Sequence, residues 1–312
     1  MPDNTLGYNY QYDQLNRLVR MKPYQRPDLT NWNWSSGTTT TSYTEAITYD
    51  PNGNIKTYNR NVDPGAPGFY TDVMDDMTYH YNANTNQLNY VDDAVPAGWC
   101  PGDIDDQASN NYLYDKIGNL IFDNQDTANY YWLNNGKLDS IHKTRVAIAF
   151  FYDPMGNRVC KRVRDLVKNK VVDTYYVRDA QGNILATYEW HDHDSLWIDE
   201  QDIYGSSRLG LVNLNTLYFT NAGGNLARAK DHSKIAEGKK QYELTNHLGN
   251  VLSTISDKKF AVDVGNNGTI DYFSPAVLSQ NDYYPGGMLM PERTFSSDNY
   301  RFGYKYPSGQ PT

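Results

Sequence analysis

The stretch ITYDPNGNI at residues 47–55 decides how this chain folds. Alternating apolar and polar residues lead into Tyr49-Asp50, and Gly53-Asn54 lead out into an aliphatic residue. An aspartate carboxylate accepts hydrogen bonds from nearby backbone N–H groups, proline presets φ, and glycine adopts positive φ without strain. The stretch therefore predicts a β-hairpin whose two strands are joined by a loop of about four or five residues.

The same pattern returns along the whole sequence. Close copies are YLYDKIGNL at 112–120 and FFYDPMGNRV at 150–159. Looser copies lie at 10–18, 79–88, 131–138, 176–184 and 242–251, and the copy at 131–138 has Asn134 in the aspartate position. The spacing between successive copies is uneven, which is unlike the fixed period of a propeller or a leucine-rich repeat. The repeats predict a continuous antiparallel ribbon of hairpins, in the all-β class.

The composition agrees with this class. The 312 residues include 28 tyrosines, and aromatic residues at 14% with charged residues at 21% argue against a disordered chain. The net charge of −9 argues against a nucleic-acid partner. The longest apolar run, Val146–Phe151, is far shorter than the roughly 20 residues of a membrane-spanning helix, and no signal peptide is recognisable at the first residues.

The repeated Tyr-Asp-x-x-Gly-Asn units resemble the YD repeats of Rhs (rearrangement hot spot) proteins, Tc-toxin C components and teneurins. YGSSRLG at 204–210 and NHLGNV at 246–251 also have counterparts in such chains. YYPGGMLMPER at 283–293 and YRFGY at 300–304 resemble the start of the Rhs repeat-associated core. The resemblance implies a YD-repeat ribbon at 1–245, the start of the core at 246–304, and a divergent tail at 305–312.

In that family the repeats spiral into a hollow β-shell that encloses a cargo, commonly a toxic domain. The resemblance implies that this chain is a non-enzymatic scaffold, part of a shell that encapsulates or presents a toxin or effector. The rest of the shell or its cargo would be the partner, and the location would be secreted or at the cell surface. Because the core motif stops early and no effector follows, we expect the truncated carboxy-terminal part of a larger repeat system. Such a piece would be an open wall with exposed strand edges.

The alternative is an extracellular adhesion module that binds glycans or a partner surface through an aromatic-rich sheet. Trp32 and Trp34 would share one face of a strand, either as a platform for sugar stacking or as ordinary cross-strand packing. The sequence has no Gly-x-Ser-x-Gly elbow, no HExxH and no GxGxxG motif ahead of a helix. We therefore predict neither an enzyme nor a bound organic cofactor.

One segment, DVGNNGTID at 263–271, is a weak candidate for Ca²⁺. Asp263, Asn267 and Asp271 fall at positions 1, 5 and 9 of a calcium loop, but Gly265 and Ser274 supply no strong oxygen donor at positions 3 and 12. Asn-Gly at 267–268 also specifies a plain hairpin turn, so both interpretations stay open.

Two other groups of reactive side chains receive structural interpretations. His191-Asp192-His193-Asp194 could bind a metal, but no further ligand motif accompanies it, and a solvated loop is expected. Cys100 and Cys160 have no CxxC spacing and are expected to be unpaired thiols without a chemical role.

Overall fold

The computed structural model describes residues 6–25 and 38–297, except 64, 67, 101–103, 222–226 and 229–236. All regular elements in these ranges are β-strands, so the all-β prediction is confirmed. The chain divides into two compact units: unit 1 comprises Met1–Tyr114 and Asn281–Thr312, and unit 2 comprises Asp115–Gln280. The boundaries predicted at 245 and 304 separate sequence motifs, whereas the two units are separated by their contacts, so the predicted boundaries stay predictions. The tail at 305–312 lies outside the described residues.

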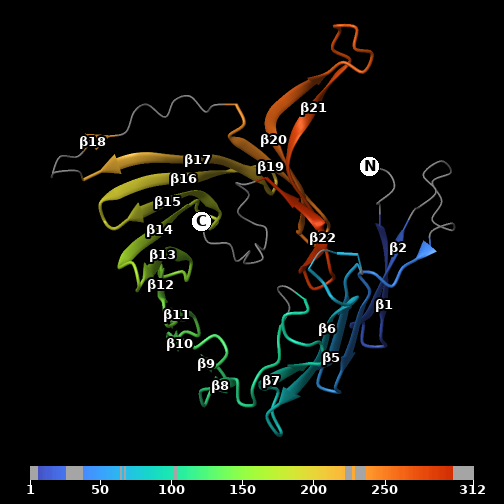
Figure 1. The fold of residues 1–312 in the computed structure, drawn as a ribbon. Helices are drawn as coiled ribbons and strands as arrows, with labels where there is room; N and C mark the ends of the chain where they lie inside the picture. The colour runs from blue at the N-terminus through green and yellow to red at the C-terminus, as the bar shows by residue number, and fades with distance from the viewer. Residues whose placement is uncertain are drawn as a thin grey trace. The chain divides into compact units, whose positions relative to one another are not determined.

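Unit 1 is built around an antiparallel sheet in the order β1-β2-β4-β5-β6-β7, with β3 paired to β2 (Figure 1). The strands of this sheet are β1 Leu6–Tyr12, β2 Leu18–Gln25, β3 Thr38–Thr39, β4 Glu45–Tyr49, β5 Ile55–Asn61, β6 Val73–Tyr81 and β7 Leu88–Asp93. The unit also holds β8 (Tyr112–Tyr114) and β22 (Leu289–Ser296). Neighbouring strands follow one another along the chain, as expected for a ribbon of hairpins.

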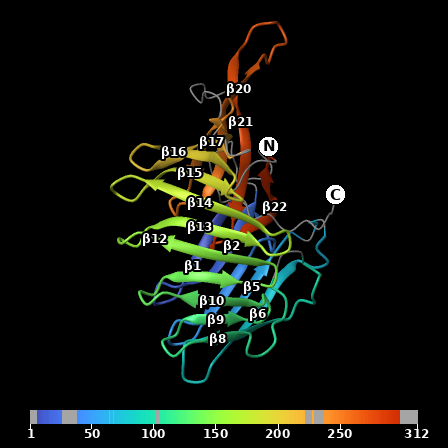
Figure 2. The ribbon, with the colours of Figure 1, turned by 90° about the vertical axis from the view of Figure 1, so that its left-hand side faces the viewer.

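Unit 2 continues in the same manner, with strands β9 to β17 lying side by side in chain order (Figure 2). After β17 the sheet continues through β19, β20 and β21, and β18 pairs with β17. The strands are β9 Leu120–Asp123, β10 Ala128–Trp132, β11 Leu138–His142, β12 Val146–Tyr152, β13 Arg158–Asp165, β14 Lys170–Arg178, β15 Ile184–His191, β16 Ser195–Tyr204, β17 Arg208–Thr220, β18 Ala227–Arg228, β19 Lys240–Thr245, β20 Val251–Val262 and β21 Tyr272–Tyr283. The predicted hairpin ribbon is therefore present.

Each repeat loop is closed by the same few hydrogen bonds. In the loop at 50–54 the backbone N–H of Asp50 donates to the Asn54 carbonyl over 2.9 Å, and that of Gly53 donates to the Asp50 carbonyl over 3.1 Å. The Asp50 carboxylate accepts the Asn54 backbone N–H at 2.9 Å and its side-chain amide at 2.8 Å. The loops at 115–119, 153–157 and 179–183 repeat this set. Gly53 has φ +91°, so the glycine is required by the backbone.

These bonds also set the charge state of the loop. The side-chain amide of the Asn four residues on is the main cause that lowers the pKa of Asp50, Asp153 and Asp179. A carboxylate that accepts several N–H bonds is stabilised in its charged form. The aspartate of the repeat therefore holds the turn as an anion.

The loop after β10 corrects one detail of the predicted repeat register. The N–H of Leu133 donates to the Lys137 carbonyl over 2.8 Å, and the N–H of Gly136 donates to the Leu133 carbonyl over 2.9 Å. Leu133, not Asn134, therefore occupies the aspartate position, and the predicted alignment of this copy is wrong by one residue. The reason is that Gly136, with φ +76°, must fall at the one loop position that needs positive φ.

The two units are stabilised differently. Unit 1 has a buried apolar cluster that includes Met21, Val62 and Met74 from the first part of the chain and Tyr284 and Met290 from the last. Among its described residues, unit 2 contains few buried apolar side chains, namely Ala128, Cys160, Ala186, Ile198, Leu211 and Val212. Its stability therefore comes from many cross-strand pairs, each worth roughly 0.2–1 kcal/mol.

Candidate functional site

A ladder of hydrogen bonds joins seven of the described hairpins to the hairpin before each of them. In these hairpins the residue just ahead of the turn donates from its side chain to the first backbone carbonyl of the preceding return strand. Tyr49 donates to Leu18 over 2.8 Å, and Tyr152 donates to Leu138 over 2.8 Å. The other rungs are Tyr81 to Ile55 at 2.9 Å, Tyr114 to Leu88 at 3.0 Å, Trp132 to Leu120 at 2.7 Å, Arg178 to Arg158 at 3.2 Å and Tyr204 to Ile184 at 3.0 Å. The tyrosine of the repeat thus connects hairpins, whereas the aspartate closes one.

A β-bulge accompanies this ladder. Among the described residues, eight hairpins shift register immediately before the last residue ahead of the turn, as between Thr48 and Tyr49 and between Phe151 and Tyr152. In six of them that last residue is a bonded rung residue. A bulge adds local twist and re-aims the side chain that follows it. In this chain the bulge directly precedes the side chain that bonds to the neighbouring hairpin. The sequence has no pattern that predicts the bulge.

Unit 1 also contains a buried row of charged side chains. Glu45, Arg60 and Asp75 stand directly opposite one another on β4, β5 and β6. Glu45 is 1% exposed and Asp75 is fully buried. The Arg60 Nε lies 2.7 Å from the Asp75 Oδ2, so these two form an ion pair. Glu45 is the member of this row for which the described residues provide no ion pair.

Burial raises the pKa of Glu45 to about 7, although Tyr58 and Arg60 act in the opposite direction. Within the described part of the chain, neither Glu45 carboxyl oxygen has a hydrogen-bond partner of normal geometry. An ionised carboxylate without such a partner is costly in a buried site, so the neutral form is favoured. Glu45 therefore changes charge near neutral pH inside the core of unit 1.

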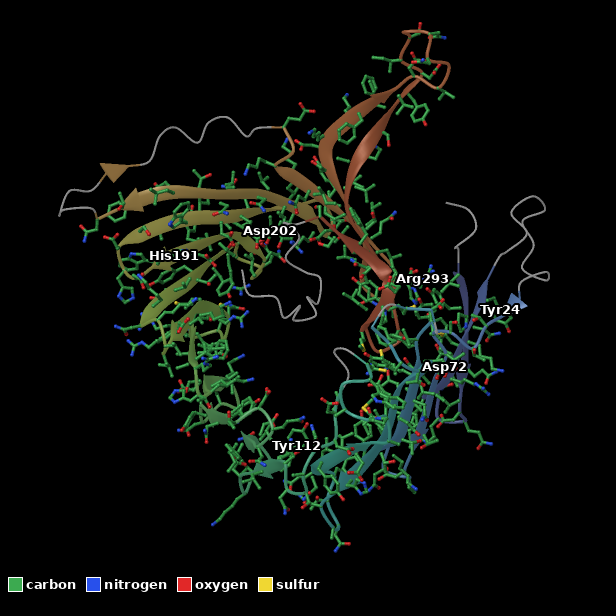
Figure 3. All side chains as sticks on the ribbon, in the orientation of Figure 1. Tyr24, Asp72, Tyr112, His191, Asp202 and Arg293 are labelled. Atoms are coloured by element: carbon green, nitrogen blue, oxygen red, sulfur yellow. The ribbon has the colours of Figure 1, made fainter. Side chains whose placement is uncertain are left out.

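The carboxy-terminal part of unit 1 packs on this row. The Arg60 guanidinium contacts the Met288 sulfur and lies 5.7 Å from the centre of the Tyr284 ring. The Tyr43 hydroxyl donates to the Pro291 carbonyl over 3.1 Å. Arg293, labelled in Figure 3, extends this covering segment and pairs with Asp282 at 2.6 Å. Because the row is covered and buried, it serves as an anchor for residues 284–293 and offers no open surface to a substrate.

The motif YGSSRLG at 204–210 has a structural role in unit 2. Arg208 lies 2.9 Å from Asp202 on β16 and 3.0 Å from Glu243 on β19. The side chain of Asp202 is visible in Figure 3. Arg208 therefore links three adjacent strands where the sheet passes from β17 to β19.

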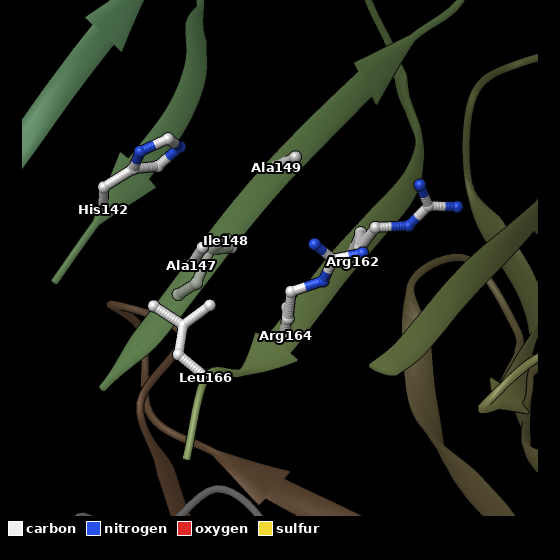
Figure 4. A pocket seen from close by; sticks show the side chains of 7 residues that line it. All are labelled: His142, Ala147, Ile148, Ala149, Arg162, Arg164 and Leu166. Carbon is white, nitrogen blue, oxygen red and sulfur yellow. The ribbon is translucent and has the colours of Figure 1, made fainter. Parts of the chain in front are cut away.

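A shallow hollow lies on the face formed by β11, β12 and β13 (Figure 4). The short side chains of Ala147 and Ala149 form part of its lining, and Arg164 and Arg162 stand directly opposite them on the next strand. Arg162 is ion-paired with the buried Asp173 at 2.7 Å. The hollow is thus apolar at its floor, and one of its two cations is already neutralised.

The predicted calcium residues lie in the loop between β20 and β21. The Asp263 carboxylate accepts the N–H groups of Asn267 and Gly268, at 3.1 Å and 2.6 Å. The Asp271 carboxylate accepts the N–H of Val264 at 2.8 Å. These are the bonds of a hairpin turn, and they use the oxygens that a cation would need. Weak Ca²⁺ binding by Asp263, Asn267 and Asp271 stays a prediction.

The segment 191–194 forms the turn between β15 and β16, with His191 at the end of β15 (Figure 3). His193 lies 3.2 Å from Asp173, and His191 lies 3.1 Å from Glu189. Over the residues that the structure describes, no group of three His, Cys, Asp or Glu side chains is arranged to hold a metal. Cys100 and Cys160 are both buried, and the Cys100 thiol donates to the Val73 carbonyl over 3.5 Å.

Trp32 and Trp34 lie outside the described residues, so the predicted aromatic platform is not located. The charged row of Glu45, Arg60 and Asp75 was missed by sequence reasoning. Its one signal is a charged residue at an inward-facing position on each of three successive strands, which becomes visible only when the register is known. No helix in the described part of the chain is long and apolar enough to cross a membrane.

Comparison with known proteins yields structural similarity alone. No protein-family model and no curated protein sequence matches the chain. Among solved structures, the chain is similar to the crystal structure of TcdB2-TccC3, at 12% identity and a TM-score of 0.37, over 91% of this chain and 15% of that one. The complex TcdB2-TccC3-Cdc42 gives the same values. The Photorhabdus luminescens Tc holotoxin pore matches at 13% identity and a TM-score of 0.33, over 91% of this chain and 14% of that one. The chain thus spans about a seventh of the length of these matched chains.

Proposed function

We propose that this chain is a non-enzymatic structural scaffold of the YD-repeat kind, part of a shell that encloses or presents a toxin or effector. The observation that carries the proposal is the ladder, in which seven described hairpins are each bonded to the preceding hairpin through the rung residue ahead of the turn. A wall made of such units grows by repetition and needs no dense core. The repeat and core motifs in the sequence support the same role.

The positions of the reactive side chains support a role without catalysis. Glu45 and Asp75 are buried, and the aspartates of the repeats are engaged in turns. A general acid or base must reach a substrate proton within hydrogen-bond distance. These carboxylates are buried or hydrogen-bonded within turns. In the described residues, no three His, Cys, Asp or Glu side chains are grouped so that they could hold a metal ion.

The proposal is tested with the neighbouring genes. An upstream reading frame rich in the same repeat and a downstream frame that encodes a small toxin would support a shell. The products of these frames would be co-expressed with this chain, and the toxin would be treated with trypsin in the complex and alone. Protection of the toxin in the complex alone is the expected result. Equal digestion in both samples would refute enclosure.

Adhesion is the second candidate, and one feature favours it. The hairpin of β20 and β21 carries exposed aromatic side chains near its end, namely Phe260, Tyr272 and Phe273. Such rings can stack on sugars or on a partner protein. Binding to a glycan array that is lost in the double variant Trp32→Ala and Trp34→Ala, or in Tyr272→Ala, would select adhesion. A blank array would remove it.

A further inference from the structure

Tyr12 occupies a rung position at which no described residue accepts its hydroxyl. It stands immediately ahead of the turn at 13–17, and the register shift between Gln11 and Tyr12 matches the bulge of the other hairpins. The tyrosines at filled rungs are half-buried, whereas Tyr12 is 59% exposed. Its hydroxyl makes no hydrogen bond within the described residues, whereas Tyr49 in the next hairpin donates to Leu18.

The strand that carries Tyr12 is an edge of its sheet. In the described part of unit 1, β1 pairs with β2 on one side and with no strand on the other. Its sequence, LGYNYQY, contains no charged residue and no proline. Proteins commonly protect free edges with charged residues or proline, because an unprotected edge pairs with other strands. The one irregularity in the described pairing of β1 is the register shift at its last residue, Tyr12. The other edge strand, β7, is covered where Val91 exchanges hydrogen bonds with Gln107.

A groove lies on β1 and reaches one residue of β2. It is lined by Gly7, Tyr8, Asn9, Tyr10, Tyr12 and Tyr24. The rings of Tyr8 and Tyr10 stack with their centres 6.5 Å apart. The lining is aromatic and uncharged, which suits the flank of another tyrosine-rich strand.

We propose that β1 is a docking edge for the return strand of a further Tyr-Asp hairpin, with the Tyr12 hydroxyl donating to the first backbone carbonyl of that strand. The inference deepens the proposed function, on which it rests, by naming the surface through which the wall is extended. Within this chain the same interface is already formed at seven rungs, and β1 continues it.

A second copy of this chain is a poorer occupant than a separate hairpin. Most described return strands, such as β2, β5 and β13, are paired on both sides. In β7 the carbonyl of Leu88 already accepts the Tyr114 hydroxyl. In β22 the first residues, Leu289 and Met290, are buried. The partner is therefore a hairpin whose return strand is free.

The test uses a synthetic peptide of residues 45–61, which carries one complete hairpin, labelled with fluorescein. Its binding to the full chain is followed by fluorescence anisotropy, and amide hydrogen exchange shows where it binds. We expect saturable binding with slower exchange in residues 6–12. Removing one hydroxyl in Tyr12→Phe should weaken binding roughly 2- to 10-fold, which is the effect of one net hydrogen bond. Tyr49→Phe is the matched control, because its rung is already filled, and should leave the affinity unchanged.

Three results would overturn the proposal: no saturable binding, equal weakening by Tyr12→Phe and Tyr49→Phe, or exchange protection away from residues 6–12. Self-association of the chain that the peptide cannot compete with would also overturn it, in favour of a second copy. A far-ultraviolet spectrum confirms that each variant is folded. The trypsin test of enclosure is independent, so peptide binding without toxin protection would refute the enclosing role and leave the docking edge standing.

Discussion

Glu45→Gln should remove a pH dependence from the stability of unit 1. Burial raises the pKa of Glu45 to about 7, whereas the carboxyl group titrates near 4.5 when it is exposed. Because the folded pKa is raised, the stabilising contribution of the neutral form is complete below about pH 4.5. It is lost as the pH rises through 7.

The size of the effect follows from that difference. A shift of about 2.5 pKa units corresponds to about 3 kcal/mol, at about 1.36 kcal/mol per unit. Most of the change, about 2.5 kcal/mol, falls between pH 5 and pH 8. With a urea dependence of about 2 kcal/mol per molar, the unfolding midpoint of unit 1 should fall by about 1 M over this interval. Glutamine keeps the shape of the side chain but cannot ionise, so the variant should show no such slope.

The two buried cysteines provide the assay. Cys100 is part of the core cluster of unit 1, and Cys160 lies in unit 2. Pulsed alkylation along a urea series at pH 5, 6, 7 and 8, read by mass spectrometry at each cysteine, reports the two units separately. Cys160 also corrects for the pH dependence of the reagent.

Glu237→Gln, at an exposed position, is the matched control and should keep the slope of the parent chain. The reasoning is refuted if the Cys100 midpoint stays constant from pH 5 to pH 8. It is equally refuted if Glu45→Gln shows the same pH dependence as the parent chain.

Four further outcomes are expected. Tyr152→Phe removes the 2.8 Å bond to the Leu138 carbonyl and should destabilise unit 2 by about 1 kcal/mol in urea unfolding, with faster amide exchange in β11 and β12. Gly210→Ala should abolish the pairing of β17 with β19, seen as lost exchange protection in residues 240–245, because the new Cβ would lie 1.9 Å from the Gln241 carbonyl oxygen. Asp153→Ala should unfold at lower urea than the parent at pH 7, and the difference should vanish as the pH falls below about 3.8, since a carboxylate with a lowered pKa contributes only when ionised. Calorimetric titration of the full chain with CaCl₂ should give weak heat that disappears in Asp271→Asn if the β20–β21 loop binds the ion, and no heat with an unchanged melting temperature would exclude the site.

Each of the three stability variants has a comparison. Tyr131→Phe alters an exposed tyrosine beside a rung and should change stability less than Tyr152→Phe. Gly249→Ala introduces strain at φ +87° but no clash, and should therefore keep the β17–β19 pairing. Asp153→Asn should recover part of the loss in Asp153→Ala, because Asn246 holds an equivalent turn with one side-chain oxygen.

Much of the fold could be predicted because its unit is local. The bonds of the loop at 50–54 join residues at most four positions apart, so Asp50, Gly53 and Asn54 specify the turn wherever they occur together. The alignment of the repeat at 131–138 was wrong by one residue, because the pattern of residue types fits equally well when it is shifted by one position. The positive φ of Gly136 allows only the alignment with Leu133 in the aspartate position.

The sequence alone therefore determined the strands, the turns and their order along the ribbon, because these follow from hydrogen bonds within a few residues. Only the tertiary structure decided which groups meet across strands. Register places Glu45 opposite Arg60, and packing brings Tyr284 onto a core begun by Met21. Such pairings depend on the twist and bulges of the whole sheet, which no short stretch of sequence encodes. For the same reason the open rung at Tyr12 could be recognised only after the filled rungs were seen.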